Sequence, residues 1–267
     1  MTKLQPVTTR SRIDLSDAAA VLPGAPRAKA TTEKAAEKQT DRISKLQRVF
    51  YADARYALLI ILQGRDASGK DGTIRKVFGA VNPQGCTVTS FKEPTPLERS
   101  HDFLWRVHAA VPPRGMIGIF NRSHYEDVLV PRVHEQLSAE ECVTRYREIV
   151  DFERMLVEQR VIVLKFMLHI SRDEQRRRLQ ERLTDPKKRW KFRQGDLDDR
   201  RMWDAFTDAY RDLLRATSTK QAPWYVVPAE DKKVRNWLVS RTIADTLETL
   251  PLAYPDPQPE IEHASFE

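Results

Sequence analysis

The feature that most constrains this chain is an apolar segment, residues 56–62, which is followed at once by a glycine-rich loop. The loop reads G-x-x-x-x-G-K, with its two glycines at Gly64 and Gly69 and its lysine at Lys70. Glycine lets the backbone approach an anion closely, and the amide N–H groups at a helix N-terminus bind phosphate. The segment therefore predicts a strand, a phosphate-binding loop and a helix. A glycine-rich turn without a ligand is the alternative.

Two carboxylates, Asp66 within the loop and Asp71 directly after it, distinguish this loop from the usual Walker A sequence. Asp71 stands where Ser or Thr normally offers a hydroxyl group to magnesium. Because the carboxylates make the loop less positive, we expect Asp66 to hold a divalent cation, with phosphate oxygens and water as the other ligands. The predicted metal is magnesium, with manganese as its substitute. The predicted phosphate contacts in the loop are Gly64, Arg65, Ala67, Ser68, Gly69 and Lys70.

The rest of the chain alternates strand-like and helix-length segments. Four further apolar strands are predicted, at residues 86–91, 116–120, 161–168 and 224–227. Strands that are apolar throughout and alternate with helices form parallel sheets covered on both faces, with ligands at the carboxyl ends of the strands. We therefore predict an α/β protein with a five-stranded parallel sheet in a three-layer α/β/α P-loop kinase fold.

Capping residues predict where some helices begin. Thr31 or Thr32 is the expected N-cap of a helix that leads into the first strand. Ser138 and Glu141 form a capping box, and an apolar face follows at helical spacing. A last amphipathic helix is expected over residues 234–250. The predicted division of the chain is an N-terminal arm at 1–30, a kinase domain at 31–252 and a mobile tail at 253–267.

Composition limits the class of protein. The chain has 267 residues with 40% hydrophobic content, enough for one large core. Its net charge of +7 favours an anionic partner, which charge alone does not identify. Two cysteines, no signal-peptide pattern and no apolar run of membrane-spanning length favour a reducing, cytoplasmic location without membrane contact.

A second group of polar residues follows the third predicted strand. Asn121, Arg122 and Glu126 lie directly after it. In a fold of this kind that strand end lies beside the phosphate loop, so these side chains can reach the reacting phosphates. We expect Asn121 to orient a metal-bound water, Arg122 to bridge phosphate oxygens and Glu126 to organise the acceptor. A polar helix cap is the alternative.

A third group is strongly basic. It runs from Arg178 to about residue 201 and combines clustered arginines and lysines with aromatic residues. Like charges four residues apart, as at Arg178 and Arg182, repel each other unless an anion lies between them. The segment thus predicts a helical lid that closes over phosphates, with a solvated surface as the alternative. The predicted lid contacts are Arg178, Arg182, Lys187, Lys188 and Lys191.

Three separated motifs, GRDASGKDGTIRKVFGAVNPQG, FNRSHYEDVLVPRVH and DPKKRWKFRQGDLDDRRMWDAF, together resemble the polyphosphate kinase 2 family over residues 35–250. The resemblance implies a P-loop kinase that uses magnesium and transfers phosphoryl groups from inorganic polyphosphate to a purine nucleotide. The FNRSHYEDVL form resembles the class III branch, which implies AMP and ADP as acceptors. It places the Walker B positions at Asn121, Arg122 and Ser123. Asn121 replaces the usual aspartate there, so we assign the metal to Asp66. We also expect a homo-oligomer, either a dimer or a tetramer.

Two other functions share part of this pattern. An ATP-dependent nucleoside or nucleotide kinase would have the same loop and lid but need fewer basic residues. A nucleic-acid-binding module would explain the charge, yet the basic residues adjoin the phosphate loop and no base-reading motif is evident. The predicted catalytic residues are Asp66, Lys70, Asn121, Arg122 and Glu126.

Overall fold

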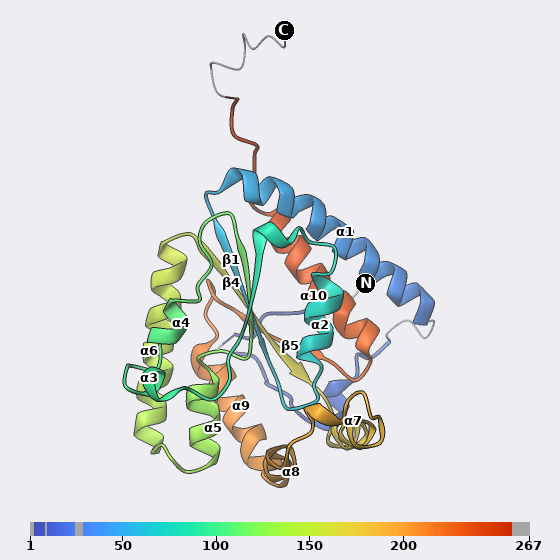
Figure 1. The fold of residues 1–267 in the computed structure, drawn as a ribbon, viewed down its shortest axis with the longest axis vertical. Helices are drawn as coiled ribbons and strands as arrows, with labels where there is room; N and C mark the ends of the chain where they lie inside the picture. The colour runs from blue at the N-terminus through green and yellow to red at the C-terminus, as the bar shows by residue number, and fades with distance from the viewer. Residues whose placement is uncertain (1–2, 9, 25–28, 258–267) are drawn as a thin grey trace.

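The computed structural model describes residues 3–8, 10–24 and 29–257. Their five strands form one parallel sheet in the order β2-β3-β1-β4-β5 (Figure 1). The strands are β1 Ala57–Gln63, β2 Cys86–Ser90, β3 Ile117–Asn121, β4 Val161–His169 and β5 Trp224–Pro228. Each bound lies within one residue of its predicted position, so the predicted α/β class and five-stranded parallel sheet are confirmed.

Helices cover both faces of the sheet. In Figure 1, α1, α2 and α10 lie on one side and α5, α6 and α9 on the other. The long helices are α1 Lys29–Asp53, α2 Lys70–Val77, α5 Glu126–Val133, α6 Ala139–Glu158, α7 Arg172–Thr184, α8 Gln194–Arg201, α9 Trp203–Thr217 and α10 Lys232–Glu248. Shorter elements are η1 Asp17–Ala20, η2 Pro83–Gly85, α3 Pro96–Arg99, α4 Trp105–His108 and η3 Arg189–Lys191.

The central strand β1 explains why the fold has two apolar cores. Side chains alternate between the faces of a strand, and every residue of β1 is buried. Ala57, Leu59 and Ile61 pack with the α5, α6 and α9 layer. Leu58, Ile60 and Leu62 pack with the α1, α2 and α10 layer. Burial on both faces fixes β1 at the centre of the sheet and so places the loop that follows it at the middle of the sheet's carboxyl edge.

Two helix starts test the capping predictions. Ser138 and Glu141 make the reciprocal bonds of a capping box at the start of α6, as predicted. The prediction for α1 is wrong, because this helix begins at Lys29 and already includes Thr31 and Thr32. Thr32 is buried in the packed helix, so its side chain is a packing group rather than a cap.

The N-terminal segment packs on the body of the protein. The Val7 amide donates to the Trp224 carbonyl oxygen (2.8 Å), and the Glu230 amide donates to the Ala20 carbonyl oxygen (3.2 Å). Val7 and Ala20 are buried. The segment therefore runs along β5 to the carboxyl edge of the sheet. Most of the tail predicted at 253–267 lies outside the described residues.

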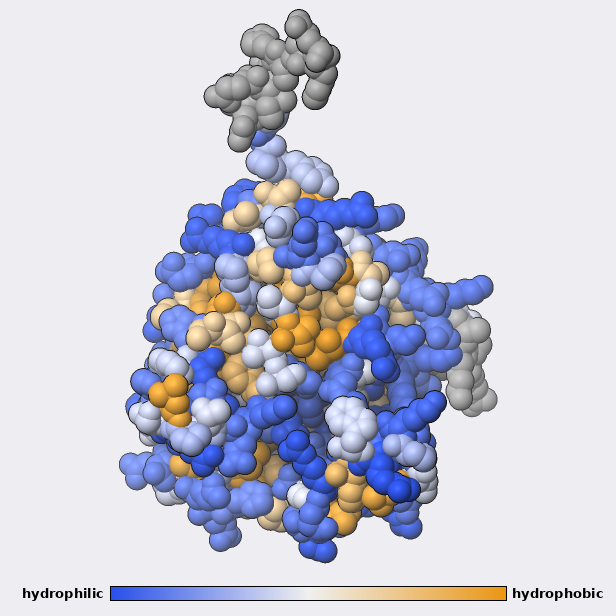
Figure 2. Space-filling model, in the orientation of Figure 1, coloured by the Kyte–Doolittle hydropathy of each residue, from blue (hydrophilic) through white to orange (hydrophobic). Residues whose placement is uncertain are grey.

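The surface is mostly polar. In the orientation of Figure 2, hydrophobic residues gather near the middle of the visible face, and hydrophilic residues cover most of its lower part, where α5, α7 and α8 lie. Within the described ranges, no helix is both long enough and apolar enough to cross a membrane.

Candidate active site

The predicted phosphate-binding loop connects β1 to α2 and has a strained backbone. Gly64 has φ 145°, Ala67 φ 64° and Gly69 φ 102°, all in the region that favours glycine. At Gly64 a Cβ atom would lie 2.6 Å from the Leu168 carbonyl oxygen, so no other residue fits without a backbone shift. The first amides of α2 begin at Lys70 and have no partners within the helix. The loop thus ends in backbone donors suited to an anion.

The Lys70 side chain folds back along the loop. Its Nζ atom donates to the carbonyl oxygens of Gly64 (2.6 Å) and Arg65 (3.3 Å). Burial lowers the pKa of Lys70, and the nearby Arg122 cation acts in the same direction. An ammonium group has three donors, so one remains for a phosphate oxygen. A bound phosphate would supply the negative charge that this buried cation needs.

Arg122 joins the phosphate loop to the end of β3. Its Nη2 lies 2.6 Å from Asp66 Oδ1, and its Nη1 lies 3.7 Å from Glu126 Oε2. Arg122 has φ 63°, an uncommon conformation for a non-glycine residue that often marks a functional site. The predicted meeting of the third strand's end with the loop is therefore present: Asp66, Arg122 and Glu126 face one another.

The three charged groups perturb one another's pKa values. Burial disfavours the charged form of Asp66, but Lys70, Arg122 and Arg182 outweigh it and hold its pKa below the usual value. Glu126 shows the opposite result, because burial raises its pKa more than Arg122 and Lys70 lower it. The attraction of Glu126 raises the pKa of Arg122. Perturbed groups clustered in a cleft are typical of functional sites.

Asn121 and Asp71 form a second contact at the same edge. Asn121 Nδ2 donates to Asp71 Oδ1 (2.9 Å), and Lys191 Nζ lies 2.9 Å from Asp71 Oδ2. Burial opposes ionisation of Asp71, but its bonds to Lys191 and Asn121 hold its pKa below the usual value. Asp71 thus ties the segment between α7 and α8, which is part of the predicted lid, to the start of α2.

A cavity of about 150 Å³ lies between these groups and the α5 and α9 helices. Asp66, Arg122 and Glu126 line its polar side, whereas Phe206 and Tyr210 contribute to its apolar side. Such a mixture of a few convergent polar groups with apolar walls is typical of a ligand site.

The Arg65 side chain does not point toward the expected phosphate position. It is buried, and its guanidinium carbon lies 3.7 Å from the centre of the Trp203 ring on α9. Its Nη2 donates to the Trp203 carbonyl oxygen (2.9 Å) and to Thr207 Oγ1 (2.5 Å). Burial lowers the pKa of Arg65 to about 10. Only the backbone of Arg65 therefore remains available for the predicted phosphate contact, while its side chain fixes the loop to α9.

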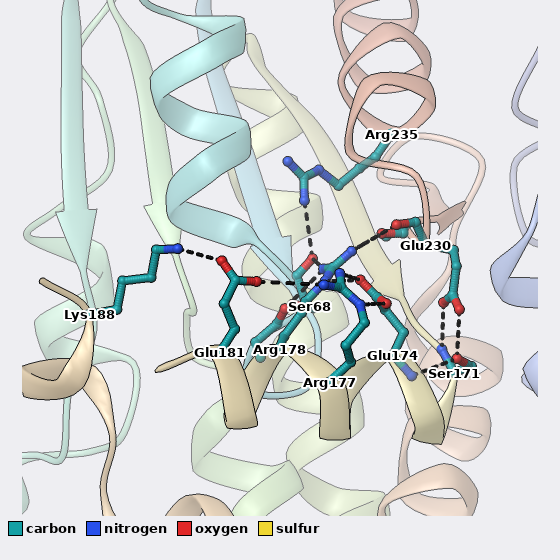
Figure 3. A network of polar contacts seen from close by, with 11 residues as sticks. Ser68, Ser171, Glu174, Arg177, Arg178, Glu181, Lys188, Glu230 and Arg235 are labelled. Atoms are coloured by element: carbon teal, nitrogen blue, oxygen red, sulfur yellow. Dashed lines mark hydrogen bonds and ion pairs between the residues drawn. The ribbon is translucent and has the colours of Figure 1, made fainter. Parts of the chain in front are cut away.

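Arg178 likewise contacts the loop rather than open solvent. Figure 3 shows Arg178 on α7 and Arg235 on α10 approaching Ser68 from two sides. Arg178 Nη1 donates to the carbonyl oxygens of Ala67 and Ser68 (both 3.0 Å), and Arg235 Nη1 lies 3.3 Å from the Ser68 oxygen. At Gly69 a Cβ atom would lie 2.0 Å from Arg235 Nη1, so the arginine fills the space that glycine leaves.

The sequence reasoning missed Arg235. A buried arginine within an otherwise apolar helix face was the available signal, because such a group needs partners. Burial lowers the pKa of Arg235 to about 10, with the nearby Arg178 cation acting in the same direction. Arg178 also contacts Glu174 at 2.5 Å, so its charge is balanced within α7. The two arginines thus hold the carbonyl groups of Ala67 and Ser68.

Several predicted lid cations have acidic partners. Arg182 lies 3.3 Å from Asp196, and Lys188 contacts Glu181 and Asp185. Ser68, a predicted phosphate contact, is fully buried, and its hydroxyl has no hydrogen-bond partner among the described residues. Lys187 lies in the exposed turn after α7. The range predicted as a lid, about 178–201, covers the end of α7, η3 and α8, and its closure over phosphates stays a prediction.

The residues present fit a magnesium ion better than a metal that requires a complete protein cage. Among the described residues, no group of three or more His, Cys, Asp or Glu side chains could hold an ion. Asp66 and Glu126 are the carboxylates on either side of Arg122. Magnesium typically takes one or two carboxylates and completes its octahedron with phosphate oxygens and water.

Comparisons with known proteins agree with this geometry. The family model of Polyphosphate kinase 2 matches residues 27–252. An AMP/ADP-polyphosphate phosphotransferase of Meiothermus ruber is 55% identical over 217 residues, which is 81% of each chain. An ADP-polyphosphate phosphotransferase of Rhodopseudomonas palustris is 46% identical over 83% of this chain and 81% of the relative.

A solved structure also places this chain beside polyphosphate kinase 2 proteins. The crystal structure of Polyphosphate Kinase 2 from Arthrobacter aurescens superposes with a TM-score of 0.89 and 42% identity, covering 94% of this chain and 90% of that chain. Family model, relatives and structure thus agree over most of the length. This chain belongs to the polyphosphate kinase 2 family.

Proposed function

We propose that this protein transfers a phosphoryl group from inorganic polyphosphate to AMP and ADP in a magnesium-dependent reaction. The observation that carries the proposal is the convergence of Lys70, Asp66, Arg122 and Glu126 at the junction of β1 and β3. The family and the names of the similar phosphotransferases support the choice of donor.

The reaction forms a bond between an acceptor phosphate oxygen and the terminal phosphorus of polyphosphate. The bridging P–O bond of the donor breaks, and the shortened chain keeps the electron pair. Such transfers need positioned charge more than covalent chemistry. The loop amides and Lys70 hold the phosphoryl group, and Arg122 balances the charge that develops. Because an acceptor phosphate is already ionised near neutral pH, Glu126 orients the acceptor rather than removing a proton.

Asp66 is the proposed metal ligand. Its pKa is held below the usual value, so it stays ionised at neutral pH. Asp66 faces the cavity but also contacts Arg122, so a bound metal would share this carboxylate with the arginine. When bound, magnesium would neutralise negative charge on the phosphate oxygens.

The acceptors are proposed to be both nucleoside monophosphates and diphosphates. The similar Meiothermus ruber protein is named for both AMP and ADP, whereas the Rhodopseudomonas palustris protein is named for ADP alone. The class III-like segment from Asn121 to Asp127 favours the wider range. A cytoplasmic location and a homo-oligomer, dimer or tetramer, remain predictions, and light scattering of the purified protein tests the latter.

The decisive experiment supplies the purified protein with magnesium, AMP or ADP, and either polyphosphate or ATP as donor. We expect ADP and ATP to form from AMP when polyphosphate is present. With ATP and AMP but no polyphosphate, we expect no transfer, because the reverse reaction needs a polyphosphate chain to accept the phosphoryl group. Efficient transfer from ATP with none from polyphosphate would instead establish an ATP-dependent kinase.

A further inference from the structure

A second and larger hollow lies outside the site described above. It has a volume of about 630 Å³ and lies between residues 12–17, the first turn of α7 and the exposed side of α9. Four arginines line it: Arg12, Arg172, Arg211 and Arg215. The mechanism proposed above uses none of them.

Most of the side-chain groups in this hollow that lack a hydrogen-bond partner are N–H donors of arginines. The guanidinium groups of Arg12, Arg172 and Arg215 make no hydrogen bond or ion pair with the part of the chain that the structure describes. Each guanidinium carries five N–H donors and no acceptor. Arg211 differs, because it pairs with Asp208 at 2.5 Å.

Three aspartates also line the hollow, and two of them are already committed to backbone groups. Asp14 Oδ1 accepts from the Ser16 amide, and Asp17 Oδ1 accepts from the Arg172 amide, each at 2.9 Å. Each bond occupies one of the about four acceptor sites of its carboxylate, so both aspartates keep their charge. Asp204 is the third aspartate, so the lining carries four arginines against three aspartates. The hollow therefore favours a ligand with many acceptor oxygens.

Only a thin wall separates this hollow from the active-site cavity. Arg65 lines the active-site cavity, Trp203 lines the second hollow, and the two side chains stack on each other. On α7, Gln175 faces the first cavity and donates to the Asp66 carbonyl oxygen (3.2 Å), whereas Arg172 faces the second. Gln175 and Arg172 therefore face the two cavities from neighbouring positions on α7.

The size of the active-site cavity explains why a polymeric donor needs such a second place. The active-site cavity has about 150 Å³, against about 630 Å³ for the second hollow, so a long chain extends beyond the first. Arg182, Lys188 and Lys191 in the lid are already paired with carboxylates. The unpaired arginines beside the second hollow are thus better placed to receive the remaining phosphates.

We propose that this hollow is a distal polyphosphate site, which binds the part of a long donor chain beyond its reacting end. The inference rests on the proposed use of polyphosphate as donor. In this proposal, Arg12, Arg172 and Arg215 make the enzyme prefer long polyphosphate chains over short ones. A short donor such as tripolyphosphate has few phosphates beyond its reacting end, so it gains little from these residues.

The test replaces Arg12, Arg172 and Arg215 together by glutamine in the full chain and measures kcat and KM for tripolyphosphate and for long-chain polyphosphate. Exposed charge contacts are individually weak, so we expect KM for the long chain to rise about tenfold for three lost contacts. KM for tripolyphosphate and for AMP should stay within about twofold. The difference should shrink at high salt, because exposed charges are screened.

A matched control replaces Arg48, Arg114 and Arg147, which are exposed and lie on other parts of the fold, by glutamine. It changes the net charge equally and should leave both donors unaffected. An equal rise in KM for short and long donors, or the same long-chain loss in the control, would overturn the distal site. Absence of turnover with every polyphosphate in the wild-type protein would instead refute the proposed function, and the distal site with it.

Discussion

Lys70 is buried, yet its ammonium group donates to two carbonyl oxygens of the loop that precedes it. Lys70→Ala should reduce kcat by about 10²-fold or more, because a positioned charge at the transferring group is lost. Single-turnover kinetics with polyphosphate and ADP measure the effect. Lys76→Ala, at an exposed position on the same helix, is the control. Activity within threefold of wild type, with unchanged melting, would remove Lys70 from the site.

Asp66 is the only carboxylate inside the phosphate loop. Asp66→Asn should raise the magnesium concentration for half-maximal rate by about tenfold or more, the scale on which the loss of metal-site contacts lowers affinity. The measurement is a magnesium titration at saturating substrates. Asp71→Asn is the comparison, since Asp71 contacts Asn121 and Lys191 instead. A larger shift for Asp71→Asn than for Asp66→Asn would move the metal to Asp71.

Glu126 should make stability depend on pH. Burial raises its pKa, so the folded state binds the proton more tightly than the unfolded chain does. The stability due to this group is therefore complete below the ordinary glutamate pKa of 4.5 and is lost as pH rises through the raised value. Glu126→Gln has no carboxyl group to ionise, so it does not lose stability in this way as the pH rises. Without metal or substrate, the variant should melt above wild type at pH 8 and close to it at pH 4.

The matched control for this pH effect is Glu140→Gln, at an exposed position on α6. Melting curves of the three proteins between pH 4 and pH 8 provide the measurement. A constant difference between Glu126→Gln and wild type across this range would show that Glu126 does not titrate abnormally. Loss of activity in the stabilised variant would indicate that the buried carboxylate is retained for function.

At the scale of elements, the phosphate loop is held between α7 and α10 by two arginines. Arg178 donates to two loop carbonyls and to two carbonyls of the segment between β5 and α10. Arg178→Lys keeps the charge but cannot reproduce this fork, so some buried carbonyls lose partners at about 1–3 kcal/mol each. We expect lower melting temperature and lower kcat together. Arg177→Lys, at the exposed neighbouring position, should change neither; an unaffected Arg178→Lys variant would contradict the proposed clamp.

The strands and the position of the loop could be predicted because their signals are local. Apolar runs in β1 and β4 are long, and glycine spacing specifies the turn between β1 and α2. The meeting of Asp66 with Arg122 followed from strand order alone, because the carboxyl ends of parallel strands share one edge. The capping box at Ser138 could be predicted because its signal, a serine three residues before a glutamate, is local.

The directions of buried arginines could not be predicted in this way. Arg65 and Arg178 were assigned to phosphate from their charge and position, yet their guanidinium groups donate to α9 and to the loop carbonyls. These partners are more than 50 residues away in sequence, and long side chains select them only after packing. The predicted start of α1 is wrong for a related reason. Tertiary packing against α10 overrides the capping preference of Thr31 and Thr32.

At the scale of the whole molecule, the N-terminal segment connects the apolar core to the proposed distal site. Val7, Ile13 and Leu15 are buried in the core layer that contains α9. Arg12, between them, faces the second hollow. The same short stretch therefore supports the stability of the fold and forms one wall of a surface site.

Removal of residues 1–20 should separate these two roles from the chemistry at the phosphate loop. Burial of three aliphatic side chains contributes about 1.5–3 kcal/mol each, most of which is offset by the entropy cost of ordering the segment. A net loss of about 2 kcal/mol corresponds to roughly 5 °C in melting temperature for a domain of this size. The truncated protein should also lose its preference for long polyphosphate while it still turns over tripolyphosphate below its melting temperature. If melting and chain-length preference both stay at their wild-type values, the segment is neither part of the core nor a wall of the donor site.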